Sequence, residues 1–402
     1  MRVIVPYAYY HPEQCAGLFV LDDLSQALAK EGIECMIYTP TPTRNVPKGT
    51  KWERDEYLCQ GMIHIHRFPM YQEGKNPLLR AFRYFLCDCY YLHKLLWGKY
   101  DIAFIDSTPP IQGLKLPILR LFRNKVIVHN VHDLFPETLS GTGLAKRGGF
   151  LWKIGMWVSN VTFRNSDKII AISNDIKRSM VARGVPKEKI DVVYNWVDEK
   201  AVQPVKKEEN PLYEEFGLSR DKFTVVYAGN LGNAQNISIV LDGAKELSEV
   251  QFAVFGSGGL ENEIRKRIEE ENLINVHLNP LQPVERVSFV YSLGDACIVS
   301  CKEGLGGSAM PSKSWSIMSC GRPVVASFDE GELKEILENN DCGVFSHAGN
   351  VQEFVDAIKS LAETPDRCTE MGANARHFIE ANLTKEVGAK KYVEIIKSVV
   401  KK

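Results

Sequence analysis

The sequence predicts an α/β protein of two domains, each built on a doubly wound, mostly parallel sheet. Short apolar runs of strand length alternate with amphipathic segments of helical period along the whole chain. The alternation stops once, at a charged stretch with two prolines, and then begins again. The length of 402 residues also suits two hydrophobic cores better than one.

The first half carries seven predicted strands separated by helices. The helix at 18–30 has Leu21, Leu24 and Leu28 on one face, and Gly32 ends it. Strands are predicted at 3–5, 35–38, 62–67, 102–105, 126–129, 168–172 and 190–193, further helices at 77–97, 113–122 and 175–183, and an exposed loop or hairpin at 40–61. Consecutive strands joined through helices imply parallel pairing.

The segment 200–220, with Pro204 and Pro211, is the predicted linker. The domains are therefore expected at 1–199 and 200–384, with a terminal helix at 385–402 packing back on the first. Strands are predicted at 223–228, 252–255, 276–278, 296–299 and 324–326. Helices are predicted at 352–362 and 366–382, and three more are expected: one that ends at 247, one that follows 259 and one that starts at Pro311.

Charge and composition limit the partners. Residues 1–200 hold 27 Lys and Arg against 20 Asp and Glu, and the rest holds 22 against 30. The basic half, with aromatic and basic helices at 77–97 and 146–164, is either an ordinary solvated face or a surface for anionic lipid headgroups. No basic stripe runs through both halves, which disfavours nucleic acid.

The chain is expected to be cytoplasmic and to touch a membrane without crossing it. It begins directly with a strand and holds no apolar run near the ~20 residues of a membrane span. Its ten cysteines include no CxxC pair, which is typical of buried thiols in a reducing compartment.

Two glycine-rich turns follow strands in the second half. Gly229-Asn230-Leu231-Gly232 and Gly256-Ser257-Gly258-Gly259 each lie between a strand and a helix, where glycine lets a ligand approach the backbone. Either turn alone could be glycine-rich for steric reasons only. No GxGxxG follows the first strand, which disfavours a nicotinamide dehydrogenase.

Pro311, Ser312 and Lys313 form a predicted helix start after a glycine-rich stretch. Backbone amides, a hydroxyl and an ammonium gather there, which favours an anion such as phosphate over a plain loop–helix–strand. Together with the two glycine turns, this segment predicts a phosphate-bearing ligand in the second domain.

The first domain offers imidazole and carboxylate groups after a strand: His129, His132, Asp133 and Glu137. Such groups can orient a hydroxyl or share a proton. His132 is predicted to contact substrate, whereas His129 is equally compatible with a structural role. The chain has no Asp-x-Asp pair for a metal–diphosphate, so no metal and no other cofactor is expected.

Several segments resemble retaining, two-Rossmann (GT-B) glycosyltransferases of family 4. The stretch SNDIKRSMVARGVPKEKIDVVYNWVD is similar to the end of that family's first domain, and VHDLFPE to its acceptor-side turn. GNLGNAQN, the glycine turn after Phe255 and PSK…GRPVVA resemble its donor domain. The similarity spans nearly the whole chain. It leans toward enzymes of bacterial O-antigen, capsule or exopolysaccharide synthesis, including N-acetylfucosaminyltransferases.

The resemblance implies two Rossmann-like domains facing a central cleft and metal-independent hexosyl transfer with retention. The donor would be a nucleotide-diphosphate sugar. Its nucleotide would be UDP, and its sugar would be an N-acetylated hexose. The acceptor would be a saccharide or a polyprenyl-linked saccharide at the inner membrane surface. Donor contacts would come from Gly17, Gly229, Asn230, Gly232, Gly256, Ser257, Ser312 and Lys313, with Glu332 near the ribose.

His132, with Asp133 nearby, and Lys313 would serve catalysis, and His129 and Glu137 would lie on the acceptor side. Many members of the family carry two glutamates eight residues apart, and this sequence has Ser308 and Ser316 at those positions. Glu303 or Lys313 would then have to take over part of their work. Three rivals stay open: a sugar-nucleotide 2-epimerase on the same scaffold, a two-lobed sugar-binding protein, and a scaffold subunit without activity.

Overall fold

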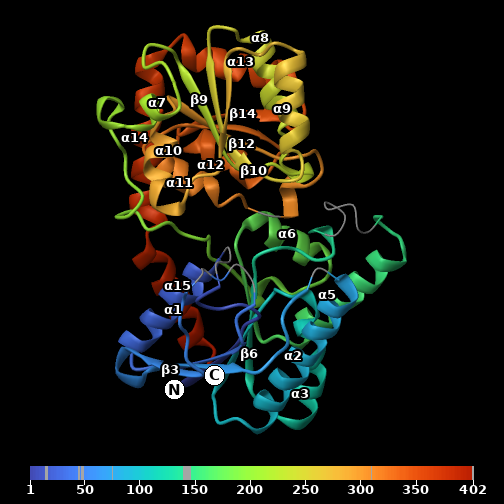
Figure 1. Ribbon diagram of the computed structural model, residues 1–402. Helices are drawn as coiled ribbons and strands as arrows, with labels where there is room; N and C mark the ends of the chain where they lie inside the picture. Colours follow the sequence, from blue (N-terminus) through green and yellow to red (C-terminus); the bar gives the residue numbers. More distant parts are fainter. Residues whose placement is uncertain are drawn as a thin grey trace. The chain divides into compact units, whose positions relative to one another are not determined.

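The computed structural model describes residues 1–13, 17–43, 46, 49–74, 76–138, 146–308 and 310–400, and it divides the chain into two compact α/β units (Figure 1). Unit 1 comprises Met1–Tyr194 together with Glu386–Lys402, and unit 2 comprises Asn195–Lys385. Unit 1 therefore ends at Tyr194, ahead of the predicted boundary at 199, and the terminal helix belongs with it.

Unit 1 is built on an eight-stranded sheet in the order β3-β4-β2-β1-β5-β6-β7-β8. All neighbours pair in parallel except β3 and β4, which form an antiparallel hairpin at one edge. The strands are β1 (Arg2–Pro6), β2 (Glu34–Pro40), β3 (Asp55–Leu58), β4 (Ile63–Phe68), β5 (Ile102–Asp106), β6 (Val126–Val131), β7 (Lys168–Ala171) and β8 (Ile190–Val192).

The helices of unit 1 are α1 (Leu18–Lys30), α2 (Pro77–Trp97), α3 (Leu116–Phe122), α5 (Phe150–Asn165), α6 (Asn174–Ala182) and α15 (Lys385–Ser398). The predicted helix at 113–122 is split, because a 3-10 segment, Pro110–Lys115, precedes α3. In α15, Tyr392 and Ile396 are fully buried, and Tyr392 packs on Phe104 of β5 with ring centroids 6.2 Å apart. The apolar face of α15 thus completes the core of unit 1.

Unit 2 is built on a six-stranded, wholly parallel sheet in the order β11-β10-β9-β12-β13-β14. Its strands are β9 (Thr224–Asn230), β10 (Gln251–Ser257), β11 (Val276–Pro280), β12 (Ala296–Ser300), β13 (Val324–Phe328) and β14 (Gly343–His347). The sequence did not predict β14. It begins with glycine, ends with histidine and has two half-buried residues in its middle, as an edge strand allows.

Helices cover both sides of this sheet (Figure 1). They are α7 (Leu212–Glu215), α8 (Ser238–Glu246), α9 (Glu261–Glu270), α10 (Val287–Ser292), α11 (Lys313–Ser319), α12 (Glu332–Asn339), α13 (Val351–Ala362) and α14 (Pro365–Asn382). A core of Val225, Tyr227, Phe252 and Val254 packs against α8 and α13 through Val240 and Phe354. Among the described helices of both units, none is both long and apolar enough to cross a membrane.

In both sheets the strand order reverses beside the first strand. The reversal lies between β1 and β5 in unit 1 and between β9 and β12 in unit 2. Connections leave such neighbouring strands in opposite directions, so a crevice opens at their carboxyl ends, and ligands of open α/β sheets bind there. The crevices therefore lie beyond β1 and β5 in unit 1 and beyond β9 and β12 in unit 2.

Candidate functional site

The two glycine turns of unit 2 lie side by side. Strands β9 and β10 pair so that Gly229 is opposite Gly256 and Asn230 is opposite Ser257. A Cβ at Gly256 would lie 2.6 Å from the carbonyl oxygen of Gly229, so only glycine fits there. Backbone of both turns is thereby brought to one spot at the carboxyl edge of the sheet.

Lys313, in the segment after β12, reaches this spot. Its Nζ lies 4.5 Å from the ring centroid of Tyr227 and 3.4 Å from the Tyr227 hydroxyl. A Cβ on Gly229, whose φ is +149°, would be 2.8 Å from the same Nζ. Tyr227 in turn donates a hydrogen bond to the carbonyl of Asn230 at 2.8 Å. The ammonium therefore lies directly against the first glycine turn.

In the part of the chain that the structure describes, this ammonium has no anionic partner. Among the described residues, no carboxylate oxygen comes within 4.0 Å of Lys313 Nζ. Burial lowers the pKa of Lys313 to about 8, since desolvation penalises the charged form. A half-buried, uncompensated cation beside glycine backbone is suited to bind an anion.

The helix at this point is shorter than the sequence predicts. It begins at Lys313 rather than at Pro311 and has seven residues, and the Ser312 side chain makes no capping hydrogen bond. The predicted helix start at Pro311 is therefore wrong by two residues. The Lys313 side chain nevertheless lies beside the first glycine turn.

The other predicted donor contacts of unit 2 differ in exposure. Asn230, Ser257 and Ser312 are exposed, and Gly232 is half-buried. Glu332, the first residue of α12, is only 3% exposed, so its carboxylate is shielded from solvent.

Asp329 was not singled out from the sequence, yet it shapes the glycine-rich loop after β12. Its carboxylate accepts hydrogen bonds from the backbone N–H groups of Gly304 (3.0 Å) and Gly306 (2.7 Å). The neighbouring Glu303 is exposed. The only sequence signal for this contact is an acidic residue shortly after the strand β13.

An apolar pocket opens beside Gly229. Its lining includes Phe255 at the end of β10, Leu281 and Pro283 after β11, and Val284 and Tyr291 near α10. Leu281 and Val284 are 50% and 76% exposed, which is unusual for such side chains. A flat apolar group of a ligand would cover them.

In unit 1, His132 lies just past β6 in a polar cluster. Its Nε2 is 3.1 Å from Asp106 Oδ2 and 2.8 Å from Asn130 Nδ2. Tyr392 of α15 donates to Asn130 Oδ1 at 2.9 Å, and the His132 backbone N–H donates to Ser107 Oγ at 3.2 Å. The His132 side chain keeps 16% of its surface exposed, so it is held firmly but is still accessible.

Electrostatics favour the protonated form of His132. Burial opposes its charge, but the carboxylate of Asp106, through charge and hydrogen bond, outweighs burial, and Asp133 adds to it. The net effect raises the pKa of His132 above its usual value. The pKa of Asp133 is raised too, because surrounding protein desolvates its carboxyl even though its outer surface is exposed.

His129 is a core residue. It is 5% exposed, its Nδ1 lies 3.1 Å from the carbonyl oxygen of Ile105, and burial lowers its pKa to about 4. It is therefore neutral at pH 7. It can meet a ligand only through a small pocket that it lines with Asp106, Asp133 and Ser159.

Glu137 forms an ion pair with Arg183, whose Nη1 also donates to the carbonyl of Phe135 at 3.0 Å. The second carboxylate oxygen of Glu137, Oε2, is buried and accepts no hydrogen bond from the described residues.

Gly17 lies immediately before α1 with φ +84°, and a Cβ there would meet nothing within 4 Å. The predicted residues of unit 1 thus surround the carboxyl ends of its strands. The sequence missed Asp106, Asn130 and Arg183, which hold His132 and Glu137 in place.

Comparison with known proteins matches both units. The family model described as Glycosyltransferase Family 4 matches residues 19–201, and the model described as Glycosyl transferases group 1 matches residues 210–378. Together they account for most of the chain.

Similar proteins span its length. A probable glycosyltransferase WbjE of Pseudomonas aeruginosa is 22% identical over 82% of this chain and 83% of its own. The putative colanic acid biosynthesis glycosyl transferase WcaI of Escherichia coli K12 is 24% identical over 99% and 100%. Among solved structures, Anabaena HepE in complex with UDP superposes with a TM-score of 0.76, at 16% identity, over 99% of this chain and 100% of its own. HepE has also been solved in complex with UDP-glucose. These structures share the GT-B fold of two Rossmann-like units with this chain.

The Asp106–His132 pair generates a direct prediction. Asp106→Asn removes the carboxylate that holds the pKa of His132 up, so this pKa should fall toward or below its usual value. Histidine chemical shifts followed by NMR over a pH series measure it. Ser107→Ala, which keeps the carboxylate, is the control and should leave the pKa close to that of the unaltered chain. A His132 pKa that does not move in Asp106→Asn would show that Asp106 does not govern it.

Proposed function

Since the chain belongs to glycosyltransferase family 4, we propose that it transfers a hexosyl group from a UDP-linked sugar to a saccharide acceptor, with retention and without a metal ion. The observation that carries this proposal is the uncompensated ammonium of Lys313 beside Gly229. The relative WcaI, whose name places it in colanic acid biosynthesis, supports a role in bacterial surface-polysaccharide synthesis.

The diphosphate of the donor fits unit 2 in charge and shape. A half-buried ammonium without a carboxylate is stabilised by an anion, and glycine backbone at Gly229 and Gly256 leaves room for one to approach. Negative charge grows on the diphosphate as the bond to the sugar breaks. A fixed cation at that place lowers the barrier, because it is already oriented before the reaction begins.

The nucleoside is assigned to the apolar pocket beside Gly229, where Phe255, Leu281 and Val284 offer surface for a flat base. The complexes of HepE with UDP and UDP-glucose support uridine as the base. The resemblance to N-acetylfucosaminyltransferases makes an N-acetylated hexose the first sugar to test.

His132 is assigned to the sugar and the acceptor hydroxyl. In the protonated ring Nε2–H donates to Asp106, so Nδ1 is the ring nitrogen left to address a ligand. The raised pKa favours the protonated ring, so His132 acts as a hydrogen-bond donor and a positive charge more than as a general base. Asp133 and Glu137 would accept hydrogen bonds from hydroxyl groups of the acceptor near His132.

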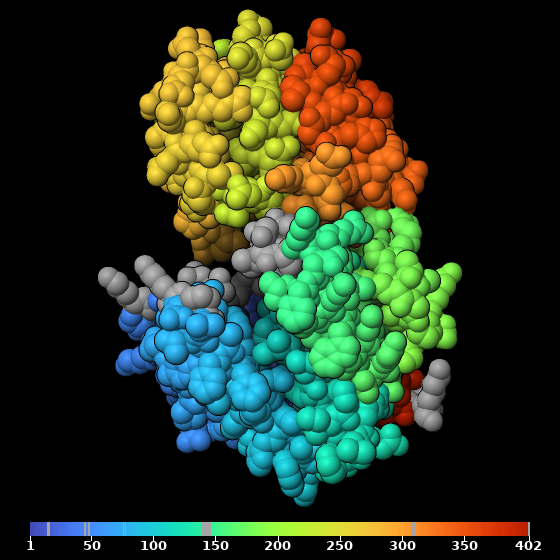
Figure 2. Space-filling model, turned by 90° about the vertical axis from the view of Figure 1, so that its right-hand side faces the viewer, coloured from blue at the N-terminus to red at the C-terminus, as the bar shows by residue number. Residues whose placement is uncertain are grey.

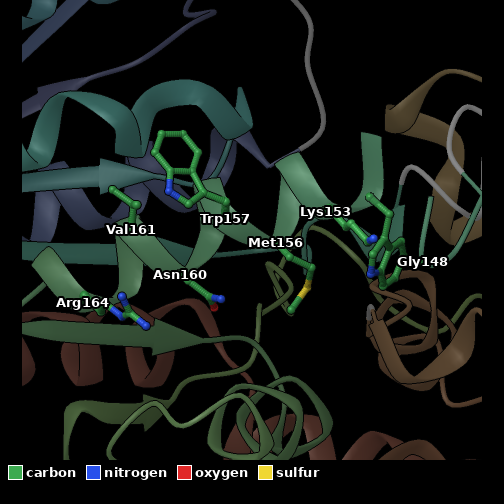
Figure 3. A pocket seen from close by; sticks show the side chains of 8 residues that line it. Gly148, Lys153, Met156, Trp157, Asn160, Val161 and Arg164 are labelled. Atoms are coloured by element: carbon green, nitrogen blue, oxygen red, sulfur yellow. The ribbon is translucent and has the colours of Figure 1, made fainter. Parts of the chain in front are cut away.

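We also assign one face of unit 1 to a membrane surface. Helices α2, α3 and α5 pack side by side (Figure 2). They carry about half of the exposed large apolar side chains among the described residues. These are Leu78, Leu79, Phe82, Phe85, Trp97, Ile118, Leu121, Phe122, Phe150, Leu151, Ile154 and Trp157. Figure 3 shows Lys153, Met156, Asn160 and Arg164 projecting from α5 around a shallow pocket.

The charge of this face fits anionic lipid. The three helices carry five Lys and Arg that are not fully buried, namely Arg80, Lys94, Arg120, Lys153 and Arg164, while Arg83 is buried beside Glu73. Their one acidic residue, Asp88, is in an ion pair with buried Lys115. Apolar side chains with a basic rim are typical of interfacial binding. A lipid-linked saccharide would then be the acceptor.

Lys313→Ala should lower kcat/KM for the UDP-sugar roughly a hundredfold, since a fixed donor to the developing charge is lost. The melting temperature should stay the same or rise, because a desolvated charge is removed. Lys266→Ala, an exposed lysine of α9 paired with Glu270, is the matched control and should change neither. Equal losses of activity and stability in Lys313→Ala would make Lys313 a residue of the fold only.

The same lysine sets a pH dependence. The pKa of free Lys313 is about 8, so the ammonium is complete below that pH and is lost above it. The bound diphosphate favours the charged form, so the affinity for UDP should weaken as pH rises through 8. Isothermal titration from pH 6.5 to 9.5 measures it. A Lys313→Arg variant, charged throughout, should show a flat profile, and a flat profile in the unaltered chain would contradict the assignment.

Transfer should survive EDTA, because Lys313 and the backbone amides neutralise the diphosphate charge that a metal would otherwise meet. Coupled detection of released UDP, with and without acceptor, measures turnover. Full loss of activity that Mg²⁺ or Mn²⁺ restores would overturn metal independence. UDP-sugar conversion that needs no acceptor would favour the epimerase instead.

Phe82→Asp combined with Trp157→Asp should reduce co-sedimentation with phosphatidylglycerol vesicles at least tenfold. Both changes place a carboxylate where an apolar side chain would enter the lipid interface. Ile274→Asp, at an 83% exposed position of unit 2, is the control and should bind as the unaltered chain does. Equal binding by the double variant, or binding to phosphatidylcholine vesicles as strong as to anionic ones, would remove the membrane assignment.

A further inference from the structure

The edge hairpin of unit 1 carries two histidines and an aspartate on one face. In its antiparallel register Asp55 of β3 is opposite His66 of β4, and Tyr57 is opposite His64. Side chains alternate between the faces of a strand, so Asp55 and Tyr57 share a face with His64 and His66. No part of the proposed transfer reaction uses these residues.

The potential ligand atoms lie close together. Asp55 Oδ1 is 2.9 Å from His64 Nε2 and 2.6 Å from His66 Nδ1, and the ligand atoms of all three residues lie within 4.8 Å of one another. Two imidazole nitrogens and one carboxylate oxygen form a set that binds zinc and similar first-row ions. All three residues are half-buried, so a fourth position is open to water.

Aromatic rings fix the two imidazoles. His64 stacks on Tyr57 with ring centroids 4.4 Å apart and an interplanar angle of 9°. His66 meets the edge of Tyr38 at 5.7 Å and lies parallel to Tyr90 at 6.4 Å. Ligands that neighbouring side chains already orient lose less freedom on binding a metal.

We propose that Asp55, His64 and His66 bind a Zn²⁺ ion, with water as the fourth ligand. Tetrahedral bonds of about 2.0–2.1 Å place neighbouring ligand atoms roughly 3.3 Å apart. The two separations from Asp55 Oδ1 need to open by less than about 1 Å, and the two imidazole nitrogens, at most 4.8 Å apart, need to close by no more than about 1.5 Å. Both hydrogen bonds to Asp55 are then replaced by bonds to the metal.

The ion would act as a clamp on the sheet edge. β3 is the last strand of the sheet and pairs only with β4 among the described strands. A metal held by one ligand from β3 and two from β4 fastens this edge to the sheet, as a structural zinc does.

This site is separate from the proposed transfer site. Four strand spacings lie between β4 and β6, which carries His129 and leads to His132. At about 4.8 Å per spacing, this is roughly 19 Å across the sheet. The proposed zinc site therefore lies well outside the His132 cluster of unit 1, and a zinc clamp at the sheet edge is compatible with transfer that needs no metal.

The test measures Zn²⁺ binding to the full chain without a histidine tag, by isothermal titration and by metal analysis after dialysis. One Zn²⁺ per chain is expected at this site, with a Kd at least tenfold weaker in His66→Ala and in Asp55→Asn. His93→Ala, an exposed histidine of α2, and Cys59→Ser, an exposed thiol on the same hairpin, are the controls and should bind as the unaltered chain does.

Zn²⁺ should also raise the melting temperature of the unaltered chain and not that of Asp55→Asn. Because Asp55→Asn keeps both histidines, it still tests the proposal if His66→Ala fails to fold. Absence of stoichiometric binding, or equal binding by His66→Ala and Asp55→Asn, would overturn the proposal. EDTA should lower the melting temperature of the zinc-loaded chain while UDP-sugar turnover continues. Loss of turnover with an unchanged zinc site would contradict metal-independent transfer and leave the clamp standing.

Discussion

Lys313 is an ammonium that is partly desolvated and has no carboxylate partner among the residues described, and such a group is costly in a folded protein. Its Nζ rests on the ring of Tyr227 and against the backbone of Gly229. A Cβ at Gly229 or Gly256 would intrude on this spot or on the neighbouring turn. An anion at this place would offset the cost, and the proposed function rests on that expectation.

The topology explains why these groups meet. In unit 2 the strand order reverses between β9 and β12, so the turn after β9 and the segment after β12 share one crevice. In unit 1 the order reverses between β1 and β5, and the neighbouring ends of β5 and β6 bring Asp106 next to His132. The same scaffold therefore supplies a fixed positive charge in one unit and a buried carboxylate–imidazole pair in the other.

Local patterns in the sequence predicted most of the elements. The helix Leu18–Lys30 and the helix Pro77–Trp97 are confirmed with the predicted bounds, because their apolar spacing and their boundaries at Gly17, Gly32 and Pro77 are local signals. Strand β14 was missed because a short edge strand that starts at Gly343 lacks an apolar run. The helix at Lys313 begins two residues later than Pro311 suggested. The glycine-rich loop after β12 is held by Asp329, a contact that no local pattern indicates.

The sequence predicted several residues of the candidate site but not the side-chain contacts that hold them in place. Glycine turns, His132 and Lys313 stand out by residue type, but Asp106 looks like the last residue of an ordinary buried strand. Its pairing with His132, the hold of Tyr392 on Asn130 and the pairing of Arg183 with Glu137 join residues remote in sequence. His129 has the same residue type as His132, and only its burial separates a core residue from an accessible one.

A crystal structure of the chain with UDP bound tests the central claim most directly. The account predicts a diphosphate oxygen within about 3 Å of Lys313 Nζ, with the uracil ring against Phe255 and Leu281. A diphosphate bound elsewhere, with Lys313 Nζ still resting on Tyr227 and touching no phosphate oxygen, would contradict it.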